Sequence, residues 1–121
     1  MFFNEFFGME GTDDFHVAVV RIEAHHKNPT GNINGGLFLA LADNLATGVA
    51  NHYYREKFGG EAFMVGVDLH ASMLSNQQGG VITARAEPVR VGKRVTVIRT
   101  VVTGDEEREL AVVTTTHVPV G

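Results

Sequence analysis

The spacing of hydrophobic residues predicts one long helix set among strands. Residues 13–24 alternate between two faces, as a half-buried strand does. From Asn34 to about Lys57 the apolar positions instead recur every three or four residues, which predicts a helix about 35 Å long. Its expected stripe consists of Leu37, Leu41, Leu45, Gly48, Val49 and His52. Four strand-like runs rich in Val follow, at roughly 61–74, 81–91, 94–103 and 108–118.

Local signals mark the ends of these elements. Asn34 is a typical N-cap for the long helix, and Gly59 with Gly60 is a typical stop. Residues 25–33 contain Asn-Pro and Gly and are expected to form a loop. Residues 2–7, rich in Phe, are expected to form a helical turn.

The predicted strands are joined by short links, at residues 75–80, 92–93 and 104–107. Short links favour antiparallel neighbours in a sheet. We therefore expect one helix packed on one face of a five-stranded antiparallel sheet, which is an α+β architecture. A length of 121 residues predicts a single domain spanning 1–121.

Composition argues against several classes of function. The absence of Cys removes disulfides, thiolate-bound metals and a cysteine nucleophile. A net charge of −4 argues against a nucleic-acid partner. The six His residues lack metal-site spacing, so no metal is expected.

The longest apolar run, 37–42, is too short to span a membrane, and the acidic start lacks the basic region of an export signal. We predict a cytoplasmic protein with no membrane partner.

Asp43 is the only charged residue in the apolar stretch 37–50. A carboxylate in a buried helix is costly unless it is paired or used. It lies on a face of small residues, comprising Gly36, Ala40, Asp43, Thr47 and Ala50. Such a face lets a ligand or a second backbone come close. The alternative is that Asp43 lies on the solvent side of the helix, although Asn44 is the better candidate for that side.

Asn34, Gly35 and Gly36 open the same helix. The first N–H groups of a helix have no partner within it and can bind an anion, a carbonyl or a developing oxyanion. Gly35 and Asp43 are eight residues apart, which is about 12 Å along the axis. One carbonyl therefore cannot touch both in one chain. A joint role requires two subunits whose helices pack antiparallel about a two-fold axis.

Three motifs together carry a resemblance to a known family. They are His26-Lys27-Asn28-Pro29-Thr30-Gly31, then Asn34-Gly35-Gly36, then Leu41-Ala42-Asp43. This order resembles the hot-dog-fold acyl-CoA thioesterases of the phenylacetate-pathway type, and the likeness extends over about residues 15–118. It implies one central helix on a five- to six-stranded antiparallel sheet. It also implies a homodimer that pairs into a homotetramer, and no cofactor beyond the coenzyme A of the substrate.

The resemblance also implies roles for individual residues. Asp43 would act as the nucleophile or as the general base that activates water. The Gly35 N–H and the Asn28 amide, from the opposite subunit, would polarise the thioester carbonyl. Gly92, Lys93 and Arg94 would lie near the nucleotide of coenzyme A. The helix start and the pocket walls would be completed by Asn34, Gly36, Thr47 and Gly66.

Two positions depart from the family pattern. Asn34 replaces a His, and it can cap the helix but cannot shuttle a proton. Gly66 stands where some relatives have Ser or Thr, whose hydroxyl orients water. Thr47, one turn from Asp43, is a candidate substitute, or else a hydroxyl bonded to its own helix.

These departures leave two other functions open. One is a non-catalytic acyl-CoA-binding or regulatory protein, which would bind acyl-CoA tightly without releasing thiol. The other is an enoyl-thioester hydratase, which would turn over an enoyl-CoA without releasing thiol, although the catalytic His of that class is absent at the helix start.

Overall fold

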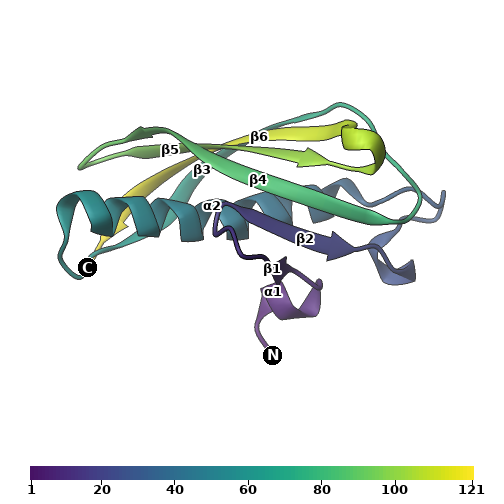
Figure 1. The fold of residues 1–121 in the computed structure, drawn as a ribbon, viewed down its shortest axis with the longest axis horizontal. Coiled ribbons are helices and arrows are strands. Elements are labelled where there is room, and N and C mark those ends of the chain that lie inside the picture. The colour runs from purple at the N-terminus through teal and green to yellow at the C-terminus, as the bar shows by residue number, and fades with distance from the viewer.

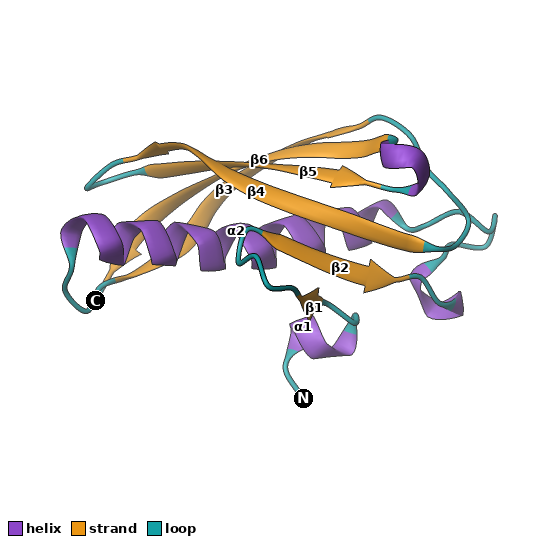
Figure 2. Cartoon of the chain, viewed as in Figure 1, coloured by secondary structure: helices purple, strands orange, loops and turns teal.

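A computed structural model describes residues 1–121 and shows one long helix lying across one face of a twisted six-stranded sheet (Figure 1). Helix α2 has 24 residues, Gly35–Phe58, and a single turn, α1, precedes it at Phe3–Phe6. The strands are β1 (Glu10–Gly11), β2 (Val17–Arg21), β3 (Phe63–Met73), β4 (Val81–Val91), β5 (Thr96–Thr103) and β6 (Glu109–Val120). Short 3₁₀ turns cover Ala24–His26 and Asp105–Glu107. In Figure 2 the α2–β3 and β4–β5 links lie at one end of the sheet, and the β3–β4 and β5–β6 links lie at the other.

The predicted elements and the α+β class are confirmed, with β1 as an additional short strand. One pairing is wrong. All pairs are antiparallel in the order β1-β2-β4-β5-β6-β3, so β3 pairs with β6 and not with β4. The link 75–80 is therefore not a hairpin. The seven residues 74–80 join the end of β3 to the start of β4, and when extended they can span more than 20 Å. The distance from β3 across β6 and β5 to β4 is about 14 Å. The chain crosses the end of the sheet, where Leu110 O accepts the N–H groups of Leu74 and Ser75.

Helix α2 begins and ends where the sequence predicts. The Asn34 side chain caps its start, and Gly59, with a positive φ of 67°, follows its end. Leu37, Leu41 and Leu45 face the core as expected, but Gly48 and His52 of the predicted stripe are exposed. The helix buries its apolar side against inward-facing residues of the sheet, which include Ala84, Ile98, Val102 and Val113.

Strand β3 forms one edge of the sheet and is largely uncovered. Of its 11 residues only Met64 is buried, and Val67 is 58% exposed. Its outer backbone edge has no strand beside it. A long, exposed and partly apolar edge strand is a surface suited to pairing with another chain.

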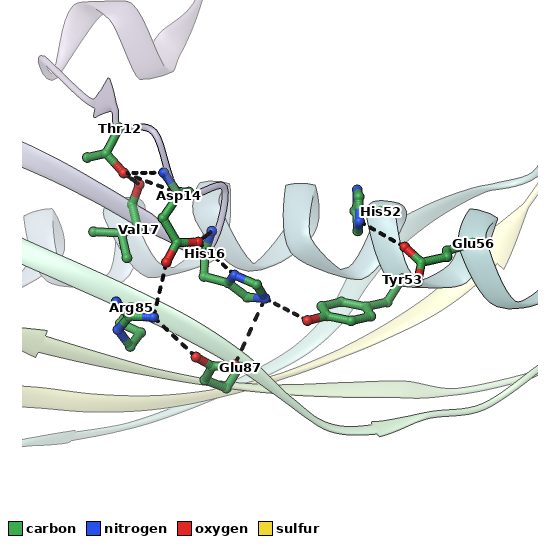
Figure 3. A network of polar contacts seen from close by, with 9 residues as sticks. All are labelled: Thr12, Asp14, His16, Val17, His52, Tyr53, Glu56, Arg85 and Glu87. Atoms are coloured by element: carbon green, nitrogen blue, oxygen red, sulfur yellow. Dashed lines mark hydrogen bonds and ion pairs between the residues drawn. The ribbon is translucent and has the colours of Figure 1, made fainter.

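A polar network ties the start of β2 to the last turns of α2. His16 bridges the two elements, with Nδ1 2.7 Å from Asp14 Oδ1 and Nε2 2.6 Å from the Tyr53 hydroxyl (Figure 3). The backbone N–H and ring of His16 hold the pKa of Asp14 below its usual value. Arg85 of β4 also contacts Asp14, at 3.4 Å. The network fixes how β2 lies against the helix.

Candidate active site

Asp43 lies in the first half of α2 with its carboxylate free. It makes no hydrogen bond or ion pair within the chain. In the single chain it is exposed, so the expectation of a buried acid is wrong unless a second molecule covers this face. Asn44, expected on the wet side, is half-buried and donates to Ala40 O at 2.8 Å. Of the predicted small-residue face, Gly36 and Asp43 are exposed, Ala40 and Thr47 are half-buried and Ala50 is fully buried, so the face is open only near Gly36 and Asp43.

The start of α2 presents one open backbone donor. Asn34 Oδ1 accepts the Gly36 N–H at 2.8 Å, and Asn34 O accepts the Leu37 N–H at 2.9 Å. The Gly35 N–H has no acceptor within the chain. The N-cap role of Asn34 is confirmed. The cap leaves Gly35 as the free donor, at the positive end of the helix dipole.

Asn28 lies in the loop that is fastened to this helix start. Asn34 N–H donates to His26 O at 2.9 Å, and Lys27 pairs with Ile33 in an isolated bridge. Asn28 Oδ1 accepts from both the N–H (3.0 Å) and the hydroxyl (2.5 Å) of Thr30. This fixes the amide and leaves its NH₂ group without an acceptor in the chain. Asn28 is therefore a second open donor in the same loop-and-helix segment.

The other predicted site residues fall into two places. Thr47 lies one turn beyond Asp43, and its carbonyl accepts from the Asn51 side chain at 2.9 Å, whereas its hydroxyl makes no hydrogen bond in the chain. Its hydroxyl is therefore not bonded to its own helix. Gly92, Lys93 and Arg94 form the β4–β5 turn, where Lys93 O accepts from Tyr54 at the far end of α2. Within one chain the helix start, Asp43 and this turn are thus spread along the helix.

His117, which no motif of the sequence singles out, also lies near Asp43. This residue of β6 is fully buried, and it lies in register with Gly66 of β3 and Thr96 of β5. Its Nε2 is 2.8 Å from Thr115 Oγ1, whereas its Nδ1 is buried with no partner. Burial lowers the pKa of His117, and the Asp43 charge opposes this. The available signal was a His at an inward position of β6, in step with Val113 and Thr115.

Gly66 separates Asp43 from His117. A Cβ at this position would lie 3.4 Å from Asp43 Oδ1 and 3.8 Å from His117 Nδ1 and Cε1. The carboxylate and the imidazole thus both lie close to Gly66. Gly66, which the resemblance places among the site residues, thus lies near Asp43, and His117 adds a third group from another strand.

The remaining polar groups offer no obvious metal centre. No three His, Asp or Glu side chains converge as metal ligands do. No helix has the length and apolar character needed to cross a membrane.

One long helix lies on a six-stranded antiparallel sheet, and this helix has an unpaired carboxylate and an open N-terminus, as the resemblance to hot-dog thioesterases implies. Comparison with known proteins agrees: the family model described as thioesterase superfamily matches residues 30–111. The chain belongs to this superfamily. The predicted hot-dog fold and the predicted enzyme class, a thioester hydrolase, are confirmed.

Individual relatives extend this result. The chain is 30% identical over 98 residues to the 1,4-dihydroxy-2-naphthoyl-CoA hydrolase of Listeria monocytogenes, covering 78% of this chain and 76% of that protein. A solved Mycobacterium tuberculosis structure superposes with a TM-score of 0.90 at 20% identity, covering 98% of this chain and 95% of that one. A Bacillus halodurans protein solved with CoA gives 0.81 at 20% identity, covering 93% and 71%. The two structures share the fold with this chain.

Proposed function

We propose that the protein hydrolyses an acyl-CoA or aryl-CoA thioester at sites formed between two subunits. One observation carries the proposal: a single helix holds an unpaired carboxylate, Asp43, and an unpaired backbone N–H, Gly35, about 12 Å apart. Both groups are of the kind that hydrolysis needs. Within one chain the two groups lie too far apart to act on the same substrate carbonyl.

In the proposed reaction Asp43 acts as the general base. It takes a proton from water as the water oxygen bonds to the thioester carbon. The Gly35 N–H and the Asn28 NH₂, from the other subunit, hold the oxygen that becomes negative. The intermediate then collapses, the C–S bond breaks, and the thiolate of coenzyme A takes the proton back from Asp43. The alternative is direct attack by Asp43 on the thioester carbon, which would expel the thiolate and give a mixed anhydride. Water attacking the Asp43 carbonyl carbon of that anhydride would then leave ¹⁸O from labelled water in the Asp43 carboxylate.

The dimer follows from the surfaces left open. Strand β3 offers an unpaired edge, and Gly36 and Asp43 of α2 are exposed. Pairing two copies about a two-fold axis, with their helices antiparallel, would bring Gly35 of one copy toward Asp43 of the other. Further pairing into a homotetramer belongs to the same proposal, in line with the phenylacetate-pathway type.

Substrate binding is proposed for the rest of the site. Gly36 and Thr47 lie on the small helix face that the acyl group would follow, and Lys93 and Arg94 beside Gly92 supply cations suited to the phosphates of coenzyme A. The Bacillus halodurans structure, solved with CoA, supports a CoA thioester. The name of the Listeria relative makes an aromatic acyl group a first candidate.

Several expectations stay as predictions under this proposal. They are a single domain over residues 1–121, a cytoplasmic location, no cofactor or metal, and no nucleic-acid or membrane partner. None of the proposed steps needs a group beyond the protein, water and the thioester.

The second candidate function is non-catalytic acyl-CoA binding. It is favoured by the absence of an imidazole at Asn34 and of a hydroxyl at Gly66. An enoyl-thioester hydratase is a weaker candidate, because the open groups found are a carboxylate and amide donors.

A thiol-release screen over aromatic and aliphatic acyl-CoAs tests the proposal. The wild type is expected to release coenzyme A from at least one of them, and Asp43→Asn is expected to lose nearly all of that activity. Tight acyl-CoA binding by calorimetry without thiol release would favour the binding protein instead. Consumption of an enoyl-CoA without thiol release would favour the hydratase.

A further inference from the structure

The backbone of Ile33 is held by a side chain from a distant part of the sequence. Asn76 Oδ1 accepts the Ile33 N–H at 2.9 Å, and Asn76 Nδ2 donates to Ile33 O at 2.9 Å. The two residues are 43 positions apart. Ile33 is 1% exposed, so leaving its backbone groups unpaired would be costly. The Asn76 amide thus clamps the residue that comes directly before Asn34 and Gly35.

The fold of the loop before α2 explains why Ile33 has this partner. Residues 26–28 and 32–34 form a small antiparallel bridge, in which Lys27 lies opposite Ile33. The hydrogen bonds of the bridge, both 2.9 Å long, are made by the residues that flank this pair. In an antiparallel pair of this kind, the N–H and C=O of the central residues point away from the partner segment. The free side of Ile33 is where a third strand would lie, and the Asn76 amide takes that place.

The β3–β4 link that carries Asn76 is fixed to the sheet. Leu110 O, at the start of β6, accepts two N–H groups of this link, at 2.9 and 3.2 Å. Arg108 Nη1 donates to Asn76 O at 3.1 Å. Asn76 Oδ1 also accepts the Gln77 N–H at 2.7 Å, and two N–H donors on one atom fix the orientation of the amide. Asn76 therefore connects the start of β6 to Ile33.

We propose that Asn76 is a positioning residue for the oxyanion site, which sets where the Gly35 N–H and the Asn28 NH₂ lie relative to the sheet. The inference rests on the proposed function, because it concerns the two donors proposed there. Ile33 lies two residues before Gly35, and its bridge partner lies next to Asn28. Asn76 acts through the backbone of Ile33 and not on the substrate itself.

The clamp also ties the donors to the strand that the proposed dimer uses. The link begins where β3 ends, and the last residue of β3, Met73, contacts the helix start as well. Met73 Cε lies 3.3 Å from the place of a Cβ on Gly35. The donors of one subunit are thus held to the strand against which the other subunit, with its Asp43, would lie.

Asn76→Ala removes both hydrogen bonds to Ile33. Misplacing a reacting group by about 1 Å can cost about 10²-fold in rate, so we expect kcat for acyl-CoA hydrolysis to fall about 10- to 10²-fold. KM should change little, because oxyanion donors act on charge that develops after the substrate has bound. Asn76→Asp, of nearly the same size, covers the case in which the alanine variant fails to fold. It sets an oxygen against Ile33 O, and its kcat should fall too.

Gln77→Ala is the matched control for Asn76→Ala. The Gln77 amide also makes two hydrogen bonds to backbone, donating to Gly79 O at 2.7 Å and accepting the Asp105 N–H at 2.9 Å. These bonds hold the link to the β5–β6 turn and not to the start of α2, so Gln77→Ala should keep the wild-type kcat. Gln77→Glu likewise controls for the charge that Asn76→Asp adds.

NMR follows the position of the donor directly. The backbone amide resonance of Gly35 should shift in Asn76→Ala and stay in place in Gln77→Ala. A loss of stability alone would change neither the Gly35 resonance of the folded protein nor the ratio of kcat to KM effects.

The outcomes distinguish this inference from the proposed function. If the wild type hydrolyses acyl-CoA and Asp43→Asn does not, then wild-type kcat in either Asn76 variant overturns the role of Asn76 alone. Equal losses of kcat in the Asn76 and Gln77 variants would also overturn it, because they would show a general effect of the link. If the wild type releases no thiol from any acyl-CoA, the proposed function and the inference both fail.

Discussion

Asn34 Oδ1 accepts the Gly36 N–H at 2.8 Å, and by doing so it leaves the Gly35 N–H as the open donor at the start of α2. The two neighbouring glycines are therefore not equivalent. One is bound to the cap, and the other has no acceptor in the chain, as the proposed contact with a substrate oxygen requires.

Replacing the cap tests this division. Asn34→Ala removes the acceptor for Gly36 and should lower the free energy of unfolding by about 0.5–2 kcal/mol in denaturant titrations. Asn34→Asp keeps an acceptor and should keep the stability. Its negative charge beside Gly35 should nevertheless lower kcat, because it repels the developing oxyanion. An Asn34→Asp enzyme as fast as the wild type would contradict the proposed place of the oxyanion.

The β4–β5 turn should tolerate no side chain at position 92. A Cβ on Gly92 would lie 2.6 Å from Val95 O, which is backbone and cannot move aside without distorting the turn. We expect Gly92→Ala to lower the free energy of unfolding by about 1–3 kcal/mol, as measured by denaturant titration.

Gly48→Ala is the opposite case on α2. A Cβ at position 48 meets no atom within 4 Å. Because Ala has the higher helix propensity, the substitution should raise the free energy of unfolding by about 0.5–1 kcal/mol. Equal effects of Gly92→Ala and Gly48→Ala would show that the turn is looser than described.

Stability should depend on pH through His117. Burial holds its pKa below the ordinary 6.5, so between pH 6.5 and the lower folded value the unfolded chain binds the proton more readily. The free energy of unfolding should therefore fall as pH drops below about 6.5, and the stabilisation should be complete above it. Denaturant titrations of the wild type and His117→Gln at several pH values isolate the contribution of His117 to the free energy of unfolding. If that free energy depended on pH in the same way in both proteins, the prediction would be contradicted.

The charge of Asp43 should be visible in the titration of His117. Asp43 raises the pKa of His117 against the effect of burial. Asp43→Asn removes that charge, so the His117 pKa should fall further, as followed by NMR of the imidazole resonances. Glu56→Gln, which changes a carboxylate beside His52 instead, is the matched control and should leave His117 unchanged. An unchanged His117 pKa in Asp43→Asn would show that the two groups lie farther apart than described.

How much the sequence could predict depends on the range of each interaction. The limits of α2 were predictable, since Asn34 and Gly59 act through neighbouring backbone atoms. The pairing of β3 with β6 was not predictable. The link 75–80 is long enough either to turn back as a hairpin or to cross the end of the sheet, so its length does not decide between the two.

The site divides in the same manner. Asp43 and Gly35 could be found from their place on one helix. The place of His117 could not, because it lies in register with Gly66, and this register joins residues 51 positions apart through the pairing of two strands. The exposure of Asp43 was also unpredictable from helix periodicity, since one chain leaves open a face that the proposed partner would cover.

The central claim, that each site combines Asp43 of one subunit with Gly35 of another, is tested most directly by mixing two inactive variants. Asp43→Asn lacks the base. Gly35→Pro lacks the N–H, and proline suits the first helical position after an extended Asn34. Random exchange of subunits should give mixed dimers with one intact site, restoring about a quarter of the wild-type thiol release per subunit. Activity in the mixture no greater than that of the separate variants, with mixed dimers demonstrated by mass spectrometry, would contradict the claim.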